Sequence, residues 1–318
     1  MDIPEELKNA IEELLSKNKK NEIIENAQII SNRYRNNDGK GKKLLTEQNE
    51  AISYAISRMP ATYAAVYSAV SQTIDNYDEN LQTLFDIGAG AGTGAAAWAV
   101  NDLVEITDVK CFEREKNMIK IGKKLMSNTE LNKVKWEQFD ILQDDITEKA
   151  DIVVTSYMIN ELPENEKEFV IEKLWKVTNK LLIIIEPGTP AGFKNVLKVR
   201  KKLLEDGGYI VTPCTHQGEC QISKDDWCAF YARVFRSSIH KQAKKGELGY
   251  EDEKFSYIAF SKVPTQNTES RILRHPQIYK GYVNVKLCTK DGIQEKKYSK
   301  KDGEIYKRIR KLNAGEKI

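Results

Sequence analysis

Hydrophobic residues recur at helical spacing along the first eighty positions of the chain, beginning with the stripe Ile3, Leu7, Ile11 and Leu14. Similar runs predict helices over residues 22–35 and 46–59, and a further helix after Pro60, because proline interrupts helices. The polar, glycine-bearing segment 36–43 predicts a loop. We therefore expect a helical N-terminal domain over residues 1–80.

From residue 81 the pattern changes to short apolar runs that alternate with helical ones. The predicted strands are TLFDIG, DVKCFE, VKWEQFD, DIVVTSY, LLIIIEP, GYIVTP and FSYIAFS, and helices are expected at 118–126, 164–178 and 191–204. Such alternation predicts an α/β domain, here residues 81–262, with a mostly parallel sheet and helices on both faces. The run LLIIIE is typical of a central strand that is buried on both sides.

A hairpin and a short helix are predicted after Pro264, giving a small extension over residues 263–318. GYVNVKLC and IQEKKY are its strands, joined through Asp291-Gly292. Val283, Val285 and Leu287 alternate onto one face of the first strand, so Cys288 points to the other face. The helix places Ile305, Ile309 and Leu312 inward and leaves Lys307, Arg308, Arg310 and Lys311 outward.

Composition and charge describe an ordinary globular chain with one basic end. The 318 residues are 40% hydrophobic and 31% charged, and no apolar run reaches the roughly 20 residues of a membrane helix. The acidic N-terminus does not resemble an export signal, so we expect a cytoplasmic protein that does not contact membranes. Residues 262–318 hold fifteen Lys and Arg against six Asp and Glu, a charge of +9 within a total of +3. This basic end is either a polyanion-binding surface or a solvated tail.

A glycine-rich turn follows the first predicted strand, in FDIGAGAGTG at residues 85–94. Glycines let the backbone approach a ligand closely, and the helix that follows offers free N–H groups to an anion. Glu113 ends the next predicted strand, where a carboxylate can accept hydrogen bonds from ribose hydroxyls. The turn therefore indicates a nucleoside-cofactor site.

The spacing of the glycines distinguishes between cofactors. If the dinucleotide pattern G-x-G-x-x-G begins at Gly88, its third glycine falls on Thr93, so the pattern fails. If it begins at Gly90, the third glycine falls on Ala95, which the pattern only permits. The pattern Asp-x-Gly-x-Gly-x-Gly instead resembles the first motif of class I S-adenosylmethionine-dependent methyltransferases. That resemblance implies a Rossmann-like sheet and S-adenosylmethionine (SAM) as cofactor. It implies a cofactor-binding set of Asp86, Gly88, Gly90, Gly92, Glu113 and Asp140.

No catalytic residue can be assigned. SYMINELP follows the fourth predicted strand, where some methyltransferases of exocyclic amines carry D/N-P-P-Y/F, so that class is disfavoured. Asn160 and Glu161 could contact cofactor or substrate, or they could cap the next helix. Pro213-Cys214 resembles the context of a cysteine nucleophile, but it lies after the fifth strand among other cysteines.

Three of the five cysteines lie within TPCTHQGECQISKDDWC, residues 212–228. Ser223 and Asp226 form a capping-box pattern that predicts a helix with Cys228 in its first turn. Four thiolates at one point would suit an iron–sulfur cluster or zinc, and a reducing location disfavours disulfides. The spacing C-x₅-C-x₇-C is wider than the usual zinc pair and favours iron–sulfur. Unrelated buried cysteines, or a mixed zinc site with His216 or His240, remain alternatives. His275, beside Arg271 and Arg274, suits a phosphate contact or is simply exposed.

Several stretches together resemble the ribosomal small-subunit methyltransferase-like family, which includes a mitochondrial small-subunit assembly factor. They are RMPATYAA (58–65), FDIGAGAGTG, SYMINELP, EPGTPAGF (186–193), the cysteine loop 212–228 of a predicted cysteine-rich insertion 212–250, RSSIH (236–240) and YEDEKFSYIAF (250–260). The resemblance implies a [4Fe-4S] cluster on Cys214, Cys220, Cys228 and Cys288, and the small ribosomal subunit with its rRNA as partner. We expect an rRNA methyltransferase, an assembly factor, or both. The alternatives are a non-enzymatic assembly factor and a zinc-stabilised small-molecule methyltransferase.

Overall fold

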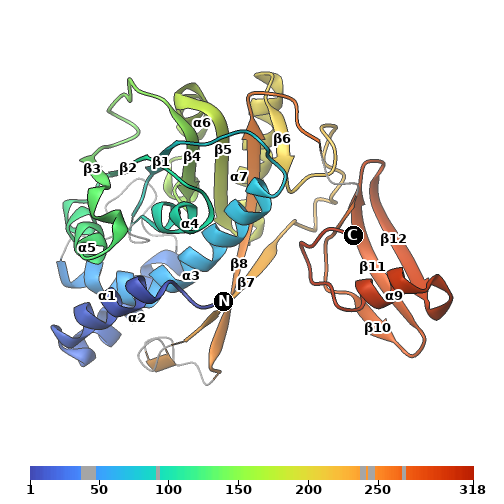
Figure 1. The fold of residues 1–318 in the computed structure, drawn as a ribbon, viewed down its shortest axis with the longest axis horizontal. Helices are drawn as coiled ribbons and strands as arrows, with labels where there is room; N and C mark the ends of the chain where they lie inside the picture. The colour runs from blue at the N-terminus through green and yellow to red at the C-terminus, as the bar shows by residue number, and fades with distance from the viewer. Residues whose placement is uncertain (37–47, 91–93, 237–240, 243–247, 267–269) are drawn as a thin grey trace.

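The computed structural model describes residues 1–36, 48–90, 94–236, 241–242, 248–266 and 270–318. Within these residues an eight-stranded sheet forms the main body, helices cover both of its faces, and a four-stranded sheet lies beside it near the C-terminus (Figure 1). None of the helices in these ranges is long and apolar enough to cross a membrane.

The elements follow one another along the chain in the order expected for a helical region, an α/β domain and a β extension. The helices are α1 (Glu5–Ser16), α2 (Lys20–Asn36), α3 (Gln48–Ile74), α4 (Ala95–Leu103), α5 (Lys116–Met126), α6 (Lys167–Val177), α7 (Pro190–Glu205) and α9 (Glu304–Ile309), with 3₁₀ turns η1 (Glu130–Lys133), η2 (Ile159–Glu161) and η3 (Lys300–Asp302). The strands are β1 (Thr83–Ile87), β2 (Asp108–Glu113), β3 (Lys135–Gln138), β4 (Ala150–Ser156), β5 (Thr178–Pro187), β6 (Tyr209–Thr212), β7 (Phe230–Phe235), β8 (Tyr250–Ser261), β9 (Ser270–Ile272), β10 (Gln277–Tyr279), β11 (Tyr282–Thr289) and β12 (Gly292–Ser299).

The main sheet has the strand order β3-β2-β1-β4-β5-β8-β6, with β7 also paired to β8. Strands β1 to β5 pair in parallel, whereas β8 runs antiparallel to β5, β6 and β7. The carboxyl ends of β1, β2, β3 and β4 therefore meet at one edge, where open α/β sheets bind their ligands. The predicted α/β, Rossmann-like fold is confirmed.

Strand β5 is buried on both faces, as its uninterrupted apolar run predicts. Leu181, Ile183 and Ile185 pack with α3 and α4 in one hydrophobic core, and Leu182 and Ile184 pack with α6 and α7 in the other. All five side chains are fully buried. Because neither face meets water, the strand needs no polar alternation.

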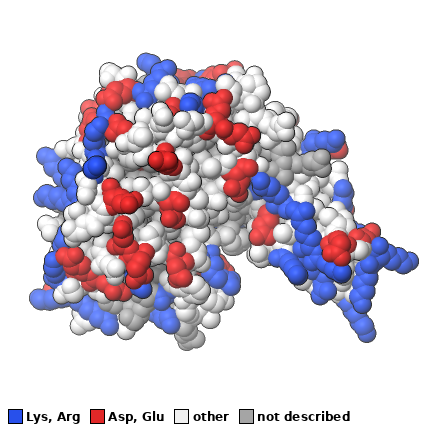
Figure 2. All heavy atoms as spheres, viewed as in Figure 1, with Lys and Arg blue, Asp and Glu red and all other residues white. Residues whose placement is uncertain are grey.

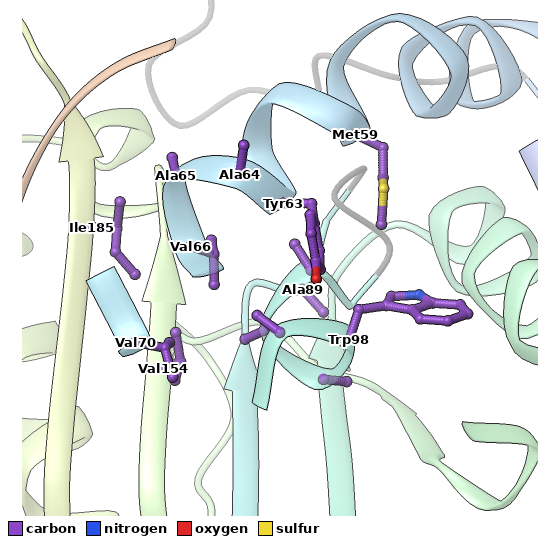
Figure 3. Close-up of a cluster of buried hydrophobic side chains, with 14 of the residues drawn as sticks. Met59, Tyr63, Ala64, Ala65, Val66, Val70, Ala89, Trp98, Val154 and Ile185 are labelled. Atoms are coloured by element: carbon purple, nitrogen blue, oxygen red, sulfur yellow. The ribbon is translucent and has the colours of Figure 1, made fainter. Parts of the chain in front are cut away.

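Helix α3 runs through Pro60 without a break, contrary to the expectation that two helices would meet there. A proline inside a helix costs about 3 kcal/mol, because one hydrogen bond is lost and the ring meets the preceding turn. Burial on both sides of Pro60 offsets this cost. Met59, Tyr63 and Val70 are almost completely buried and share one core with Trp98 and Val154 (Figure 3).

The helix predicted from Ser223 is wrong, and strand β7 forms in its place. In β7, Phe230, Ala232 and Val234 are buried while the residues between them are exposed. The apolar residues thus follow a period of two, which pairing with β8 uses directly. Consequently Cys228 lies in the segment before a strand and is not near a helix N-terminus.

The C-terminal unit, residues 270–318, has its own small core. Val283, Val285 and Leu287 of β11 pack against Tyr306 and Ile309 of α9, so the predicted hairpin and helix are confirmed. Lys290 and Asp291 form the turn between the paired residues Thr289 and Gly292, one position earlier than expected. Strands β9 and β10 were not predicted. They complete this sheet by pairing with opposite ends of β11, β10 with residues 282–284 and β9 with residues 287–289.

One buried arginine joins the C-terminal unit to the main body. The side chain of Arg271 is 1% exposed. Its Nε donates to the carbonyl of Pro213 over 2.8 Å, and its Nη1 donates to Gln72 over 2.6 Å and to the carbonyl of Gly315. Nearby, the ring of Phe230 lies so close to Gly315 that a Cβ there would be 2.4 Å away. The two units are therefore packed tightly at this junction.

Candidate functional site

The glycine turn follows β1 at the carboxyl edge of the sheet. Gly88, Gly90 and Gly94 adopt positive φ angles of 72°, 50° and 75°, which other residues rarely adopt. Gly92 lies outside the described residues. A Cβ on Gly88 would lie 2.8 Å from the Sδ of Met158, a residue that follows β4. Glycine is therefore required at position 88 both by the backbone angle and by the close approach of Met158.

Asp86 lies at the end of β1 and is 1% exposed. Its Oδ2 accepts a hydrogen bond of 3.2 Å from the N–H of Ala96 in the first turn of α4, and its Oδ1 has no partner within the described residues. Burial raises the pKa of this carboxyl to about 7, although the helix amides oppose the change. Asp86 thus supports the turn and presents one oxygen that still lacks a donor.

Glu113 connects the end of β2 to the glycine turn. Its Oε2 accepts from the N–H of Gly90 and its Oε1 from the N–H of Glu115, both over 2.7 Å. Burial raises the pKa of Glu113, and the two amide donors act in the opposite direction. Each carboxylate oxygen can accept a second hydrogen bond, so the side chain remains able to receive ribose hydroxyls.

Asp140 lies just after β3, on the neighbouring strand of the same edge. The preceding Phe139 donates its N–H to the carbonyl of Glu113 over 3.0 Å, which places Asp140 close to the second strand. The Oδ1 of Asp140 accepts the N–H of Leu142 over 3.0 Å. The described members of the predicted cofactor set therefore lie on the ends of β1, β2 and β3, along one edge.

Two groups of buried polar residues near this edge were missed by sequence reasoning. Glu253 of β8 accepts from the guanidinium of Arg58 over 2.9 Å and from the hydroxyl of Tyr157 over 3.0 Å. Glu186 at the end of β5 is fully buried and accepts from Asn195 over 2.7 Å. Burial raises the pKa of Glu186 to about 8. Four of these five residues, all except Asn195, stand in motifs that carry the family resemblance, but only the fold brings them together.

The tyrosine directly after β4 is bound to a neighbouring carboxylate. Tyr157 has a φ of 61°, rare for a residue with a side chain, and its hydroxyl is bound to Glu253. Asn160 and Glu161 form the 3₁₀ turn η2 that follows. Whether either residue contacts a cofactor or substrate stays a prediction.

Four cysteines from two units line one cavity. Cys214 and Cys220 belong to the loop after β6, Cys228 precedes β7, and Cys288 comes from β11 of the C-terminal unit. Cys288 faces away from the valines, as predicted, and its Sγ lies 3.4 Å from the hydroxyl of Thr215 in that loop. Cys111 is buried in β2, in the core of the main body.

The thiols lie in a partly desolvated environment. Burial raises the pKa of Cys214 to about 11, with the nearby charge of Arg200 acting in the opposite direction. Burial also raises the pKa of Cys220 and of Cys228, and for Cys228 the three other thiols add to the effect. Mutual influence among all four is consistent with their common cavity. In the described part of the chain, however, no three His, Cys, Asp or Glu side chains form a group that could hold a single metal ion.

Two buried arginines complete the wall of this cavity. Arg200 is 6% exposed and Arg271 is 1% exposed, and both line the cavity together with the cysteines and His216. The Nε of Arg200 and the Nη2 of Arg271 make no hydrogen bond within the described residues. A guanidinium nitrogen that is buried without an acceptor is costly, so the cavity is suited to an anionic group. Sequence reasoning missed Arg200, because it stands in an amphipathic helix, and named Arg271 only as a neighbour of His275.

The exposed basic residues lie elsewhere on the C-terminal unit. Figure 2 shows Lys and Arg gathered over this unit, at the right of the view, whereas Asp and Glu are frequent on the visible face of the main body. The exposed cations are Lys280, Lys290, Lys296, Lys297, Lys300, Lys301, Lys307, Arg308, Arg310 and Lys311. Arg271 is not among them, and Arg274 binds Asp226 and the carbonyl of Trp227. Exposed His275 packs against Tyr231, and His240 lies outside the described residues.

The strand order and the glycine turn after β1 define a class I methyltransferase fold. The chain belongs to the family described as mitochondrial small ribosomal subunit Rsm22, whose model matches residues 48–318. It is 24% identical over 267 residues to the human mitochondrial ribosome assembly protein METTL17, covering 76% of this chain and 56% of that protein. It is 23% identical over 320 residues to the mitochondrial Rsm22-cox11 tandem protein 2 of Schizosaccharomyces pombe, covering 83% and 42%. The chain thus spans about half the length of these curated relatives.

Solved structures similar to the chain include two methyltransferases. The magnesium protoporphyrin IX methyltransferase of Synechocystis PCC 6803 with bound SAM is 13% identical, with a TM-score of 0.40 over 73% of this chain and 90% of that one. The N-methyltransferase NodS of Bradyrhizobium japonicum WM9 with S-adenosyl-L-homocysteine is 11% identical, with a TM-score of 0.41 over 64% and 87%.

Proposed function

We propose that the protein is a SAM-binding, iron–sulfur-containing methyltransferase-like protein that acts on the small ribosomal subunit, as an rRNA methyltransferase, an assembly factor, or both. The observation that carries this proposal is the meeting of Cys214, Cys220, Cys228 and Cys288 at one cavity. The last of these comes from a separate unit, sixty residues further along the chain than Cys228. Family membership supports the ribosomal part, and the glycine turn supports the cofactor.

SAM would bind along the carboxyl edge of β1, β2 and β3. In this proposal Gly88, Gly90 and Gly92 admit the cofactor, Asp86 supports the turn, Glu113 receives the ribose hydroxyls and Asp140 lies near the adenine. Replacing Glu113 by Gln removes the charge that strengthens such hydrogen bonds, so SAM should bind about tenfold more weakly in calorimetry. Glu137→Gln, an exposed change on β3, is the control and should bind SAM as the wild type does. Equal affinities for the wild type and the Glu113 variant would remove Glu113 from the site.

The four thiols and two arginines fit a [4Fe-4S] cluster by their chemistry. Such clusters are held by four cysteine thiolates. The complete assembly carries negative charge, which Arg200 and Arg271 would offset. Arg271 also holds the loop of Cys214 through the carbonyl of Pro213, so the loop and the C-terminal unit are placed together. When bound, the cluster would supply a covalent link between the two units.

Metal analysis after anaerobic purification tests this part of the proposal. We expect iron and acid-labile sulfide in equal amounts, and a large loss of both in Cys288→Ser. Cys111→Ala is the matched control, because Cys111 lies in the main core away from the cavity, and its iron content should match the wild type. Zinc without sulfide would favour the zinc-stabilised small-molecule methyltransferase instead. Iron that is unchanged in Cys288→Ser would remove that residue from the ligand set.

The small ribosomal subunit and its rRNA are the proposed partners. The exposed cations of the C-terminal unit would contact phosphates, and such contacts make binding fall steeply with salt. Co-sedimentation with purified small subunits at several salt concentrations measures this dependence. Absence of the protein from the subunit fraction at low salt would contradict the proposal. The predicted cytoplasmic location stays a prediction, and the named curated relatives are mitochondrial proteins.

A non-enzymatic assembly factor is the second candidate, and one observation favours it. The hydroxyl of Tyr157, the aromatic residue directly after β4, already donates to Glu253 over 3.0 Å. Transfer of tritium from labelled SAM to immature small subunits separates the two candidates. Label in rRNA identifies a methyltransferase, whereas SAM binding without label in RNA or protein identifies the assembly factor.

A further inference from the structure

A pair of tyrosines, Tyr279 exposed and Tyr282 half-buried, lies on the same sheet face as Cys288, at the other end of β11. The rings of Tyr279 and Tyr282 are stacked, with centroids 4.8 Å apart and an angle of 15° between their planes. The ammonium group of Lys297 lies 4.0 Å from the centroid of Tyr282. Tyr279 stands on β10 and is 45% exposed. The core of the unit does not explain the pair, because Val283 and Val285 point to the opposite face.

The strand register places this group on one continuous surface. Tyr279 pairs with Tyr282, and Lys297 pairs with Asn284, the next residue of β11 on that face. From Tyr282 to Cys288 the strand extends for about 20 Å. A ligand at the tyrosines would therefore lie well away from the cysteine cavity while contacting the same strand.

We propose that this face, Tyr279 with Tyr282 and Lys297, binds an unpaired nucleobase of single-stranded RNA. Unpaired bases stack on exposed aromatic rings, and lysines beside them neutralise the phosphates. One face of the Tyr279 ring covers Tyr282. A base can therefore continue the stack on the opposite face of the Tyr279 ring. The surroundings are basic, with Lys280, Lys300 and Lys301 all exposed, which favours RNA over a protein segment as the occupant. This inference rests on the proposed ribosomal function and specifies where one base of the RNA would bind.

The test compares binding of the full chain to a fluorescent single-stranded oligonucleotide and to the matching duplex. Stacking contributes about 1–3 kcal/mol per base, so Tyr279→Ala should weaken single-strand binding about 5- to 150-fold and leave duplex binding unchanged. Tyr279→Phe keeps the ring and should retain the wild-type affinity. Phe169→Ala is the matched control, because Phe169 is 46% exposed beneath a lysine on the main body and should not affect either RNA.

Each result separates this inference from the proposed function. Single-strand affinity that is unchanged in Tyr279→Ala, or that falls equally in Tyr279→Phe, would overturn the stacking site and leave ribosome binding intact. Equal affinity of the wild-type protein for the duplex and for the single strand would also overturn the stacking site and leave ribosome binding intact. Wild-type protein that binds neither RNA and does not co-sediment with small subunits would contradict both proposals. Thermal unfolding of each variant confirms that the fold is retained.

Discussion

Replacing Arg271 by Ala removes the side chain that joins the C-terminal unit to the main body. The carbonyls of Pro213 and Gly315 lose their donor, and the side chain of Gln72 loses one of two donors, because its Oε1 also accepts from the hydroxyl of Tyr257. The arginine is 1% exposed, so water cannot replace the lost hydrogen bonds without rearrangement at the junction.

The expected loss of stability follows from these contacts. Each buried acceptor without a donor costs about 1–3 kcal/mol, and removing the buried charge itself recovers part of the total. We therefore expect the free energy of unfolding to fall by about 3–5 kcal/mol, a large share of the roughly 5–15 kcal/mol typical of folded proteins. The C-terminal unit should separate first, because its own core is small.

Urea unfolding of the metal-free protein measures this loss, and limited proteolysis reports where the chain opens. Arg233→Ala is the matched control, since Arg233 is exposed, pairs with Asp252 over 2.7 Å, and should cost less than about 1 kcal/mol. Proteolysis of the Arg271 variant should increase at residues 263–270, between the units. A loss no larger than that of the control, with no new cleavage there, would refute the claim that Arg271 joins the two units.

Three further predictions concern buried charge and close packing. Glu186 has a pKa raised to about 8 by burial, so its contribution to stability is present below its ordinary value of 4.5 and is lost as the pH rises to about 8. As the pH rises from 4.5 to about 8, the free energy of unfolding should therefore fall less for Glu186→Gln than for the wild type. Chemical unfolding at several pH values measures this, and equal pH dependence of the two proteins would contradict the prediction. Gly88→Ala should lower stability by about 1–3 kcal/mol and weaken SAM binding, because of the positive φ and the contact with Met158. Arg200→Gln should lose iron to a chelator several-fold faster than Arg200→Lys, which keeps the charge; equal rates would exclude a role for that charge.

The main sheet could be predicted from the sequence because each of its signals is local. The apolar run of β5 and the glycine turn after β1 report burial and backbone angle within a few residues. The errors arose where tertiary packing prevails over a local signal. Pro60 should end a helix, yet buried residues on both sides keep α3 continuous, and Ser223 begins a helix pattern that pairing with β8 overrides.

The candidate site was only partly visible in the sequence for the same reason. Alternation along β11 was sufficient to place Cys288 opposite the valines, and the fold brings it to the other three cysteines. Arg200 and Arg271 could not be assigned, because a basic residue in an amphipathic helix or a basic tail is ordinarily exposed. Only the packing of the two units shows that both arginines are buried at the same cavity.

Strands β9 and β11 connect the proposed cluster site at the cysteines with the proposed RNA-binding face at the tyrosines. Arg271 pairs with Cys288 in the strand register, so the residue that joins the units and the proposed ligand are held side by side. A group that binds all four thiols binds more tightly when the C-terminal unit is packed on the main body than when the two units are separated. That difference in binding free energy stabilises the packed arrangement by the same amount. The stacked tyrosines stand on the same strand as Cys288. Loading of the cysteine site would thus fix the orientation of the RNA-binding face relative to the cofactor edge, and loss of the metal would weaken RNA binding without altering any RNA contact.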